Sequence, residues 1–439
     1  MSNEILAPLM LVCLLMGIFA GYRVAFVVGG VAVIFCYIGG GPTLFNVLPS
    51  RVMGIMGNYT LAAVPLFIFM GAMLQISGAA ENLYESIYLW LGPLRGGLAI
   101  TTVIISTLLA AATGIIGATE TTMGMVALPA MIKKNYNKPL ATGTILVGGT
   151  LGILIPPSIM LIILAPTTGV SVISLFAGAI IPGLLLSSLY IIYIILLCLI
   201  RPEMGPALSK EDRSIPIKVL LFKTLVHLIP PIVLILLVLG TIFFGVAAPT
   251  EAAAVGAVGS VLVAAVNRRI NWQVLKQSIF QTLRVTSMVL MIAVGASLFS
   301  AVFASIGGSK AILSALNYLP ESNWITLFAM MFLVLIMGMF LDWFAIILIV
   351  MPILMIVSNK IGFDPLWFSI IICVNLQIAF LTPPFAYAIF YLKGVAPPEV
   401  TIYDIYKGIV PFIGLQIIGL ILCILFPQLV LWLPSIMAK

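Results

Sequence analysis

The dominant pattern of this 439-residue chain is a series of long apolar stretches that carry no charge. A helix that crosses the ~30 Å hydrocarbon core of a membrane needs ~20 mainly apolar residues. The stretches are too long and too uniform for the alternating ~10-residue strands of a membrane barrel. We therefore predict an all-α polytopic membrane protein with about ten crossings, five in each half, near residues 5–20, 24–40, 58–77, 139–165, 171–200, 216–242, 247–266, 284–306, 366–391 and 406–434.

Residues 97–132 and 324–357 do not fit this count. Each segment has about 36 residues and would extend ~54 Å as a helix, too long for one crossing and short for two joined by a loop. An interruption with Gly or an acid lies midway in each, at 114–120 and at 338–342. Irregular backbone within a membrane is tolerated only where protein or a cavity covers it. We predict two re-entrant helical hairpins whose tips reach the midplane; the alternative is a pair of short, tilted crossings in each segment.

Composition and charge exclude most other classes. The chain is 63% apolar and 8% charged, whereas a soluble globular protein has about 25% charged residues. In the predicted topology sixteen of the 20 Lys and Arg residues lie on one face, and only Arg51, Lys310, Lys360 and Lys439 lie on the other. The positive-inside rule places the first face in the cytoplasm and both termini outside. The net charge of +7 therefore requires no nucleic acid, and the five cysteines, without a Cys-x-x-Cys pair, indicate no metal site.

Glycine and proline residues recur in the two halves of the chain at a nearly constant offset. The pairs are Gly21 with Gly245, Pro129 with Pro352, Pro139 with Pro365, Pro156-Pro157 with Pro383-Pro384, and Pro182 with Pro411. Because each half has an odd number of crossings, we predict inverted repeats over 1–213 and 214–439. The first contains hairpin 97–132 and broken helix 139–165, and the second contains hairpin 324–357 and broken helix 366–391. Inverted repeats with matching interrupted helices are typical of secondary transporters that bind solute at the midplane.

The two proline doublets, Pro156-Pro157 and Pro383-Pro384, predict sites that could bind ions. Proline has no N–H and clashes with the carbonyl one turn back, so both doublets should open the helix inside the bilayer. Opened carbonyls with nearby hydroxyls are hard oxygen ligands for an alkali cation. The N-termini of the resumed half-helices suit a carboxylate. The alternative is that each doublet only kinks a helix for packing.

Three acidic residues, Glu120, Asp342 and Glu251, fall inside apolar segments. An ionised carboxylate at mid-bilayer costs ~2.5–3.5 kcal/mol on insertion scales, so such residues are rarely idle. For Glu120 and Asp342, at the hairpin tips, we expect either attraction of a cation or capping of the second helical arm. Glu251 is interpreted as a helix-start acid near the external surface.

Four motifs together resemble the large membrane subunit, the M or DctM-type subunit, of TRAP (tripartite ATP-independent periplasmic) transporters. They are Gly-Ala-Thr-Glu-Thr-Thr-Met-Gly at 117–124, Gly-Ile-Leu-Ile-Pro-Pro-Ser at 152–158, Ala-Pro-Thr-Glu-Ala-Ala-Ala at 248–254 and Asn-Leu-Gln-Ile-Ala-Phe-Leu-Thr-Pro-Pro at 375–384. The resemblance covers nearly the whole chain.

The resemblance implies an elevator-type symporter of the bacterial inner membrane and not an enzyme. A transport domain built from both hairpins and both broken helices would move against a scaffold formed by the rest. It would import a carboxylated organic solute with Na⁺, taking the solute from a periplasmic binding protein and working with a small four-helix (Q-type) membrane subunit. Three alternatives remain at this point: a stand-alone sodium/dicarboxylate symporter, a scaffold subunit that does not transport, and an intramembrane aspartyl protease. The protease would need two facing carboxylates, and Asp342 is the only Asp within these segments.

The resemblance also implies the ligands of two sodium ions. Sodium site 1 corresponds to Thr119, Gly152, Ile155 and Pro157, and sodium site 2 to Gly338, Ala379, Thr382 and Phe385. Further candidates for the transport site are Gly117, Glu120, Asp342, Pro156, Pro383 and Pro384. The family commonly has Ser-Gly-Ser-Ser at the first tip. This chain has Ile-Gly-Ala-Thr at 116–119, so a single hydroxyl remains there as a side-chain ligand.

Overall fold

The computed structural model describes residues 3–114, 116–208, 216–316, 322–383 and 386–437. Every regular element among these residues is helical, and no strand occurs in them. The predicted all-α class is confirmed.

The helices follow one another with short connections throughout the described ranges. The first half contains α1 (Asn3–Phe19), α2 (Val24–Phe45), α3 (Val47–Met56), α4 (Tyr59–Ile76), α5 (Ala79–Leu91), α6 (Gly97–Thr113), α7 (Ile116–Lys133), α8 (Lys138–Thr150), η1 (Leu151–Ile153), α9 (Ile159–Thr168), α10 (Val172–Ile200) and η2 (Pro202–Met204). The second half contains α11 (Ile217–Phe243), α12 (Pro249–Val266), α13 (Trp272–Ser305), α14 (Gly308–Leu316), α15 (Asn323–Gly338), α16 (Trp343–Ala345), the π-helix η4 (Ile346–Val350), α17 (Met351–Ile361), α18 (Pro365–Leu381), α19 (Tyr387–Val395), α20 (Ile402–Leu425) and α21 (Gln428–Met437).

Each of the ten predicted crossings coincides with one helix or with two consecutive helices. The crossing at 139–165 corresponds to α8 and α9, that at 366–391 to α18 and α19, and that at 406–434 to α20 and α21. By length and composition alone, seven helical segments of the described chain could span a membrane: α4, α10, α11, α12, α13, the continuous segment 343–361, and α20. The remaining crossings are made of shorter apolar helices, among them α1, α9 and α18.

The two unusual segments are helix–turn–helix pairs. In the first, α6 and α7 contact each other and are separated only by residues 114–115. In the second, α15 is followed by a turn at 339–342 and then by α16, η4 and α17, and α15 contacts η4. These bounds match the two arms predicted at 97–132 and at 324–357, and the prediction that the pairs are re-entrant and not two short crossings stays a prediction. The second arm of the second hairpin contains the π-helix, a local widening that is often found at functional sites.

Equivalent positions in the two halves have equivalent conformations. Gly21 and Gly245, which precede α2 and α12, both have a positive φ, of +84° and +66°. Pro139 and Pro365 both lie in the first turn of a helix, α8 and α18. Pro182 and Pro411 both lie inside a long helix, α10 and α20. The order of elements therefore repeats between the halves in the register that the sequence predicts.

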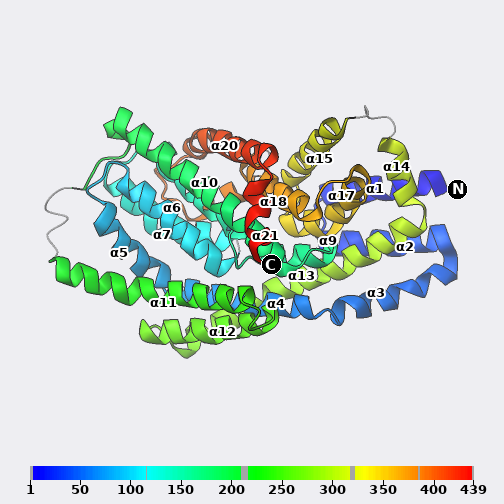
Figure 1. The fold of residues 1–439 in the computed structure, drawn as a ribbon, viewed down its shortest axis with the longest axis horizontal. Coiled ribbons are helices and arrows are strands. Elements are labelled where there is room, and N and C mark those ends of the chain that lie inside the picture. The colour runs from blue at the N-terminus through cyan, green and yellow to red at the C-terminus, as the bar shows by residue number, and fades with distance from the viewer. Residues whose placement is uncertain (1–2, 115, 209–215, 317–321, 384–385, 438–439) are drawn as a thin grey trace.

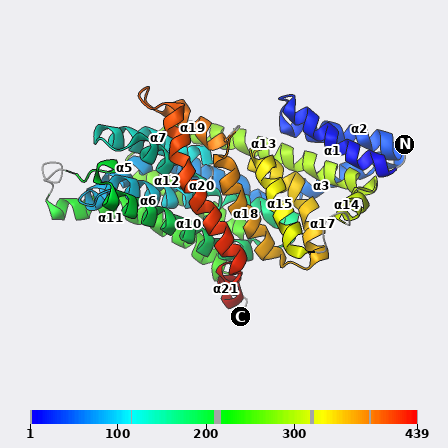
Figure 2. The same ribbon diagram turned by 90° about the horizontal axis from the view of Figure 1, so that it is seen from above.

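Two layers of helices position the hairpins. Helices α11, α12, α4, α13 and α2 lie along one side of the molecule, the lower edge of Figure 1. Within this layer α12 packs on α4 and α11, and α13 packs on α2, α3 and α4. The hairpins and the broken helices lie on the other side, and Figure 2 shows α15 and α17 next to α18. Helix α4 joins the layers because it also contacts α6, α7 and α9.

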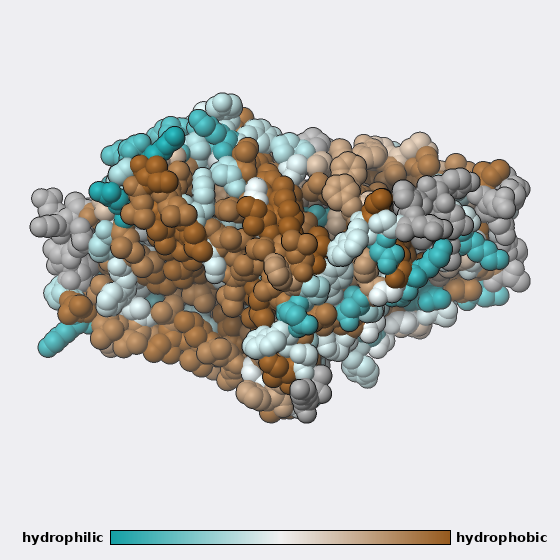
Figure 3. Space-filling model, turned by 45° about the horizontal axis from the view of Figure 1, so that its top comes forward, coloured by the Kyte–Doolittle hydropathy of each residue, from teal (hydrophilic) through white to brown (hydrophobic). Residues whose placement is uncertain are grey.

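Much of the outer surface is apolar, as expected for a protein surrounded by lipid. Large hydrophobic side chains are exposed along α10 and α11, for example Leu199, Ile200, Phe222 and Leu236. Figure 3 shows broad hydrophobic areas on one face of the molecule, with hydrophilic residues gathered at its margins. A soluble protein rarely exposes contiguous apolar patches of this extent.

Sequence analysis missed several short helices. It did not predict α3, α5 or α14, or the first turns of α13, which begins at Trp272 instead of near residue 284. These segments carry charges, such as Arg51 in α3 and Lys276 in α13, that interrupt the apolar pattern on which the prediction depended.

Gly245, which lies between α11 and α12, has a left-handed backbone conformation that favours glycine. A Cβ built on Gly245 meets no atom within 4 Å, so Gly245→Ala would add backbone strain without a clash. Because that conformation costs an L-residue ~1–2 kcal/mol, we expect a lower thermal unfolding temperature for the purified protein. The matched control is Gly240→Ala inside α11, where the space is also open and Ala is favoured by roughly 1 kcal/mol. Equal unfolding temperatures for the two variants would contradict this account.

Candidate functional site

The first helix break lies between α8 and α9. Asn137 is the N-cap of α8, and its Oδ1 accepts a hydrogen bond from Leu140 N at 3.1 Å. The helical path continues through η1 to Ile153. Helix α9 resumes only at Ile159. Because Pro156 has no N–H, the Gly152 carbonyl loses the donor that a continuous helix would supply. The Ile153 carbonyl accepts a hydrogen bond from the Ser158 hydroxyl instead.

The tip of the first hairpin contacts this break. Gly114 has a φ of +60°, and a Cβ placed there would lie 3.1 Å from the backbone nitrogen of Ile159, so the tip touches the start of α9. The second arm, α7, contacts η1 and α8. In that contact a Cβ built on Gly149 would lie 2.1 Å from Cγ of Glu120. Small residues at these positions therefore allow the hairpin tip to approach the opened helix closely.

The second break lies after α18, whose last residue is Leu381. Thr382 adopts an extended conformation, its N–H donates to the Ala379 carbonyl at 3.2 Å, and its hydroxyl donates to the Ile378 carbonyl at 2.7 Å. Because the hydroxyl proton is used in this bond, the Oγ1 lone pairs remain available to a cation. Pro383 follows directly and cannot continue the helix.

The tip of the second hairpin packs against the second break. A Cβ built on Gly338 would lie 2.5 Å from Cβ of Ala379, so only glycine fits between the end of α15 and α18. Beyond the break, the Tyr387 hydroxyl donates to the Phe340 carbonyl at 3.1 Å and ties α19 to the turn of the hairpin. Each hairpin tip therefore packs against the broken helix of its own half.

The first and second halves of the chain also pack against each other at these elements. The second arm of the first hairpin, α7, packs on α19, which is the resumed part of the second broken helix. Reciprocally, η4 and α17 of the second hairpin pack on α9, the resumed part of the first broken helix. A single unit thus contains both hairpins and both breaks.

The two acids at the hairpins have different environments. Asp342 is the N-cap of α16, and its Oδ1 accepts from Ala345 N at 2.9 Å, so the capping interpretation is confirmed for this residue. Glu120 is fully buried in the second turn of α7, and neither carboxyl oxygen has a hydrogen-bond partner among the described residues. The capping interpretation is wrong for Glu120 because α7 begins at Ile116. Glu251 accepts from Ala248 N at 2.8 Å at the start of α12, as predicted for a helix-start acid.

Two residues that sequence analysis missed connect the tips to their surroundings. The ring of Tyr391 in α19 packs on Gly117, where a built Cβ would lie 2.8 Å from the ring, and Tyr391 lies close enough to Glu120 and Asp342 to interact electrostatically with both. Gln75 in α4 donates to the Ala118 carbonyl at 3.2 Å and links the first tip to the other layer. Neither contact could be predicted from spacing, since each joins segments distant in sequence.

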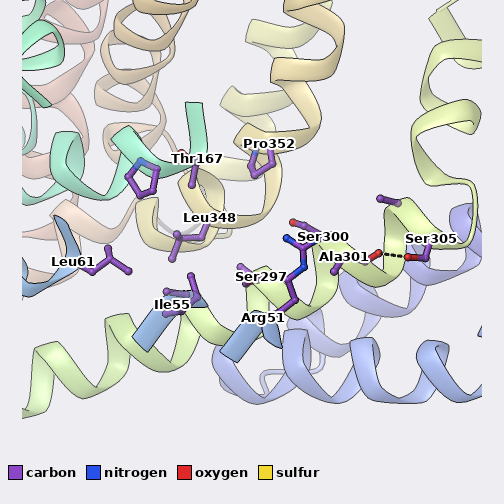
Figure 4. A pocket seen from close by; sticks show the side chains of 14 residues that line it. Arg51, Ile55, Leu61, Thr167, Ser297, Ser300, Ala301, Ser305, Leu348 and Pro352 are labelled. Atoms are coloured by element: carbon purple, nitrogen blue, oxygen red, sulfur yellow. Dashed lines mark hydrogen bonds between the residues drawn. The ribbon is translucent and has the colours of Figure 1, made fainter. Parts of the chain in front are cut away.

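A cavity of about 550 Å³ separates the two layers on one side of this unit. Its walls are α3, α4 and α13 on one side and α9, η4 and α17 on the other, and Figure 4 shows Arg51 directed toward the face of α13 that carries Ser297 and Ser300. Small side chains such as Ala293 and Ala296 line the same stretch of α13. Among the described residues that line the cavity, Arg51 alone is charged. The cavity has the size of a small-molecule site.

The structure places most of the predicted site residues around the two breaks. Gly338 contacts Ala379 directly, and the helix that carries Thr119 contacts η1, which contains Gly152. Ile155, Pro156 and Pro157 are buried in the first gap. Pro384 and Phe385 lie outside the described residues. The sequence signal for this site was the pair of proline doublets.

Comparison with known proteins supports the same assignment. Residues 9–429 match the family described as "Tripartite ATP-independent periplasmic transporter, DctM component". The C4-dicarboxylate TRAP transporter large permease protein DctM of Pseudomonas aeruginosa is 32% identical over 399 residues, with 90% of each chain covered. The sialic acid TRAP transporter large permease protein SiaM of Vibrio cholerae is 27% identical, with 95% of this chain and 96% of that protein covered. The ectoine TRAP transporter large permease protein TeaC of Halomonas elongata is 29% identical, with coverage of 90% and 91%.

A solved structure shares the fold. The crystal structure of the YdaH transporter of Alcanivorax borkumensis, described as having an unusual topology, superposes with a TM-score of 0.59 at 16% identity and covers 88% of each chain. The family match over nearly the whole chain, the curated relatives and the paired hairpins and breaks agree: the chain belongs to the DctM component family of tripartite ATP-independent periplasmic transporters.

Proposed function

We propose that this permease imports a small organic carboxylate together with Na⁺ by an elevator mechanism. The solute is delivered by a periplasmic binding protein, and the permease works with a small four-helix (Q-type) membrane subunit in the bacterial inner membrane, with both termini periplasmic. The observation that carries this proposal is the packing of each hairpin tip against a proline-opened helix. No observation on this chain favours a stand-alone symporter.

Sodium coupling is supported by the chemistry of the breaks. The Gly152 carbonyl lacks its helical donor, and the Thr382 hydroxyl oxygen keeps its lone pairs free. Neutral oxygens of this kind, at breaks in buried helices, are the usual ligands of Na⁺ in secondary transporters. Thr119, Ile155 and Pro157 would complete the first site. Gly338, Ala379 and Phe385 would complete the second.

A carboxylate solute is supported by the relatives and by local charge. The three solutes named for the relatives above, a C4-dicarboxylate, sialic acid and ectoine, all carry a carboxylate. The guanidinium of Arg51 and the hydroxyls of Ser297 and Ser300, which line the cavity, would suit such an anion as it enters between the layers. At the tips themselves the solute would depend on bound Na⁺ and on helix N-termini.

The elevator mechanism is supported by the arrangement of the helices in two groups, the unit of hairpins and breaks and the remaining helices. The unit of hairpins and breaks is held together by contacts between the two repeats, 1–213 and 214–439. The cavity separates that unit from α3 and α13 over part of their interface. We propose that this unit is the transport domain and that the remaining helices form the scaffold.

Removing the Thr382 hydroxyl should weaken sodium dependence. For Thr382→Ala we expect the Na⁺ concentration for half-maximal uptake, in proteoliposomes supplied with the binding protein, to rise about tenfold, the equivalent of ~1.4 kcal/mol. The control is Thr282→Ala in α13, which loses a similar hydroxyl-to-carbonyl bond, to Ser278 at 2.7 Å. An unchanged sodium response of Thr382→Ala would exclude this ligand, and solute uptake without the binding protein would indicate a stand-alone symporter.

Neutralising Glu120 should lower transport more than it lowers expression. Glu120→Gln keeps the side-chain volume that packs against Gly149 but removes a buried charge in the tip. We expect a several-fold loss of initial uptake rate at an unchanged amount of protein in the membrane. Glu85→Gln, on the exposed face of α5, serves as the control. A parallel loss of expression and uptake would assign Glu120 a folding role instead.

Linking the two layers across the cavity should stop transport. In a background without native cysteines, Ser300→Cys in α13 and Leu348→Cys in η4 line opposite walls of the cavity. A short bifunctional thiol reagent should abolish uptake by this pair because it fixes the transport domain to the scaffold. The control pair, Ile55→Cys and Ser297→Cys, lies within the proposed scaffold. Full uptake by the linked Ser300–Leu348 pair would contradict an elevator movement.

A further inference from the structure

A second polar cavity, of about 340 Å³, lies at one end of α8, α10 and α20, apart from the hairpin tips. Arg201, the C-cap of α10, and Lys407, in the second turn of α20, line it together with Asn137. None of the described residues that line it is acidic. The cavity therefore has two positive charges and a neutral amide on its polar side.

The two cations are available to a ligand. Neither side chain makes an ion pair or a hydrogen bond with the residues that the structure describes. Asp404 interacts electrostatically with Lys407, but its carboxylate accepts hydrogen bonds from the backbone N–H and the hydroxyl of Thr401, at 2.9 and 2.7 Å. Its role as a helix cap leaves the charge of Lys407 without a direct partner.

The other side of the cavity is apolar and aromatic. Leu197 and Phe412 line it, and the ring of Tyr193 meets that of Phe412 edge to face with centroids 5.2 Å apart. A free inorganic anion would make no favourable contact with these apolar side chains. An amphiphile with an anionic head and a hydrocarbon body matches both sides.

The position of the cavity along the helices corresponds to the depth of lipid headgroups. Exposed apolar side chains on α10 extend up to Leu199 and Ile200, which are 60% and 77% exposed, and Arg201 follows immediately. On α20 a long run of exposed apolar side chains extends from Val410 to Leu425, after Lys407, and Ile402 and Tyr403 at the start of the helix are exposed as well. Arg201 thus lies where the exposed apolar surface of α10 ends, and Lys407 lies one turn before the long exposed apolar run of α20.

We propose that this cavity binds an anionic phospholipid. The phosphodiester lies between Arg201 and Lys407, with the Arg201 guanidinium able to donate two parallel hydrogen bonds to its oxygens, and the acyl chains follow Leu197 and Phe412 onto the outer faces of α10 and α20. Basic pockets between membrane helices are known to select acidic headgroups. This inference does not depend on sodium coupling or on the identity of the solute.

The packing of α20 on α8 places the cavity beside a broken helix. Helix α20 is held tightly against α8 here, since a Cβ on Gly408 would lie 2.2 Å from the Pro139 carbonyl oxygen. Helix α8 is the first part of a broken helix. The bound lipid therefore bridges α10 and α20 beside an element of the proposed transport domain.

Native mass spectrometry of the full-length protein tests this site with phosphatidylglycerol and phosphatidylcholine as probes. We expect wild-type protein to retain phosphatidylglycerol preferentially. The double variant Arg201→Gln/Lys407→Gln should lose that retention by about thirtyfold, because two basic residues near an anionic headgroup contribute ~1 kcal/mol each. The charge-matched control Arg268→Gln/Arg269→Gln, which lies outside the cavity, should retain it. The conservative exchange Arg201→Lys/Lys407→Arg should also retain it and shows that the fold tolerates change there.

Three results would overturn the proposal. They are equal retention of the two lipids by the wild-type protein, unchanged retention of phosphatidylglycerol by the Gln double variant, and displacement of the lipid by millimolar inorganic phosphate. The last result would show that the site takes a free anion. Thermal unfolding with and without phosphatidylglycerol gives a second readout, and the stabilisation by lipid should disappear only in the Gln double variant.

Discussion

The fold of this permease depends on how backbone N–H and C=O groups that lack a hydrogen-bond partner are shielded from the membrane. In hydrocarbon, such groups must be satisfied within the protein or in a cavity. The prolines after Ile155 and Thr382 remove N–H donors from buried helices. The chain covers each resulting gap with a helical hairpin, and glycines at Gly114 and Gly338 allow that cover to be close. The freed oxygens are thereby covered by protein, where we propose that they bind Na⁺.

The contacts that cover the breaks also join the two halves of the chain. Because α7 rests on α19 while η4 and α17 rest on α9, neither repeat can build the unit alone. Tyr391 illustrates the result, since a residue of the second half packs on the first hairpin tip at Gly117 and lies near the acids of both tips. The two breaks are therefore joined through packed side chains.

The sequence was sufficient to predict the features that depend on length and on proline. The crossings, both hairpins and the register of the repeat were predicted from apolar runs and from doublets, and Gly21 and Gly245 share a positive φ, as that register would require. Short amphipathic helices such as α3 and α5 were missed because their charges break the apolar pattern. The capping role expected for Glu120 was wrong, since α7 begins at Ile116, and its attraction of a cation stays a prediction. The cavity around Arg51 could not be foreseen because its walls come from elements up to 300 residues apart.

Equilibrium binding of ²²Na⁺ to the purified wild-type permease, without membrane gradient or partner proteins, tests the central claim most directly. The account predicts saturable binding that excess unlabelled Na⁺ displaces and that choline leaves intact, because the proposed oxygen ligands at the two breaks would enclose only a small alkali ion. Absence of saturable binding, or equal displacement by choline, would contradict it.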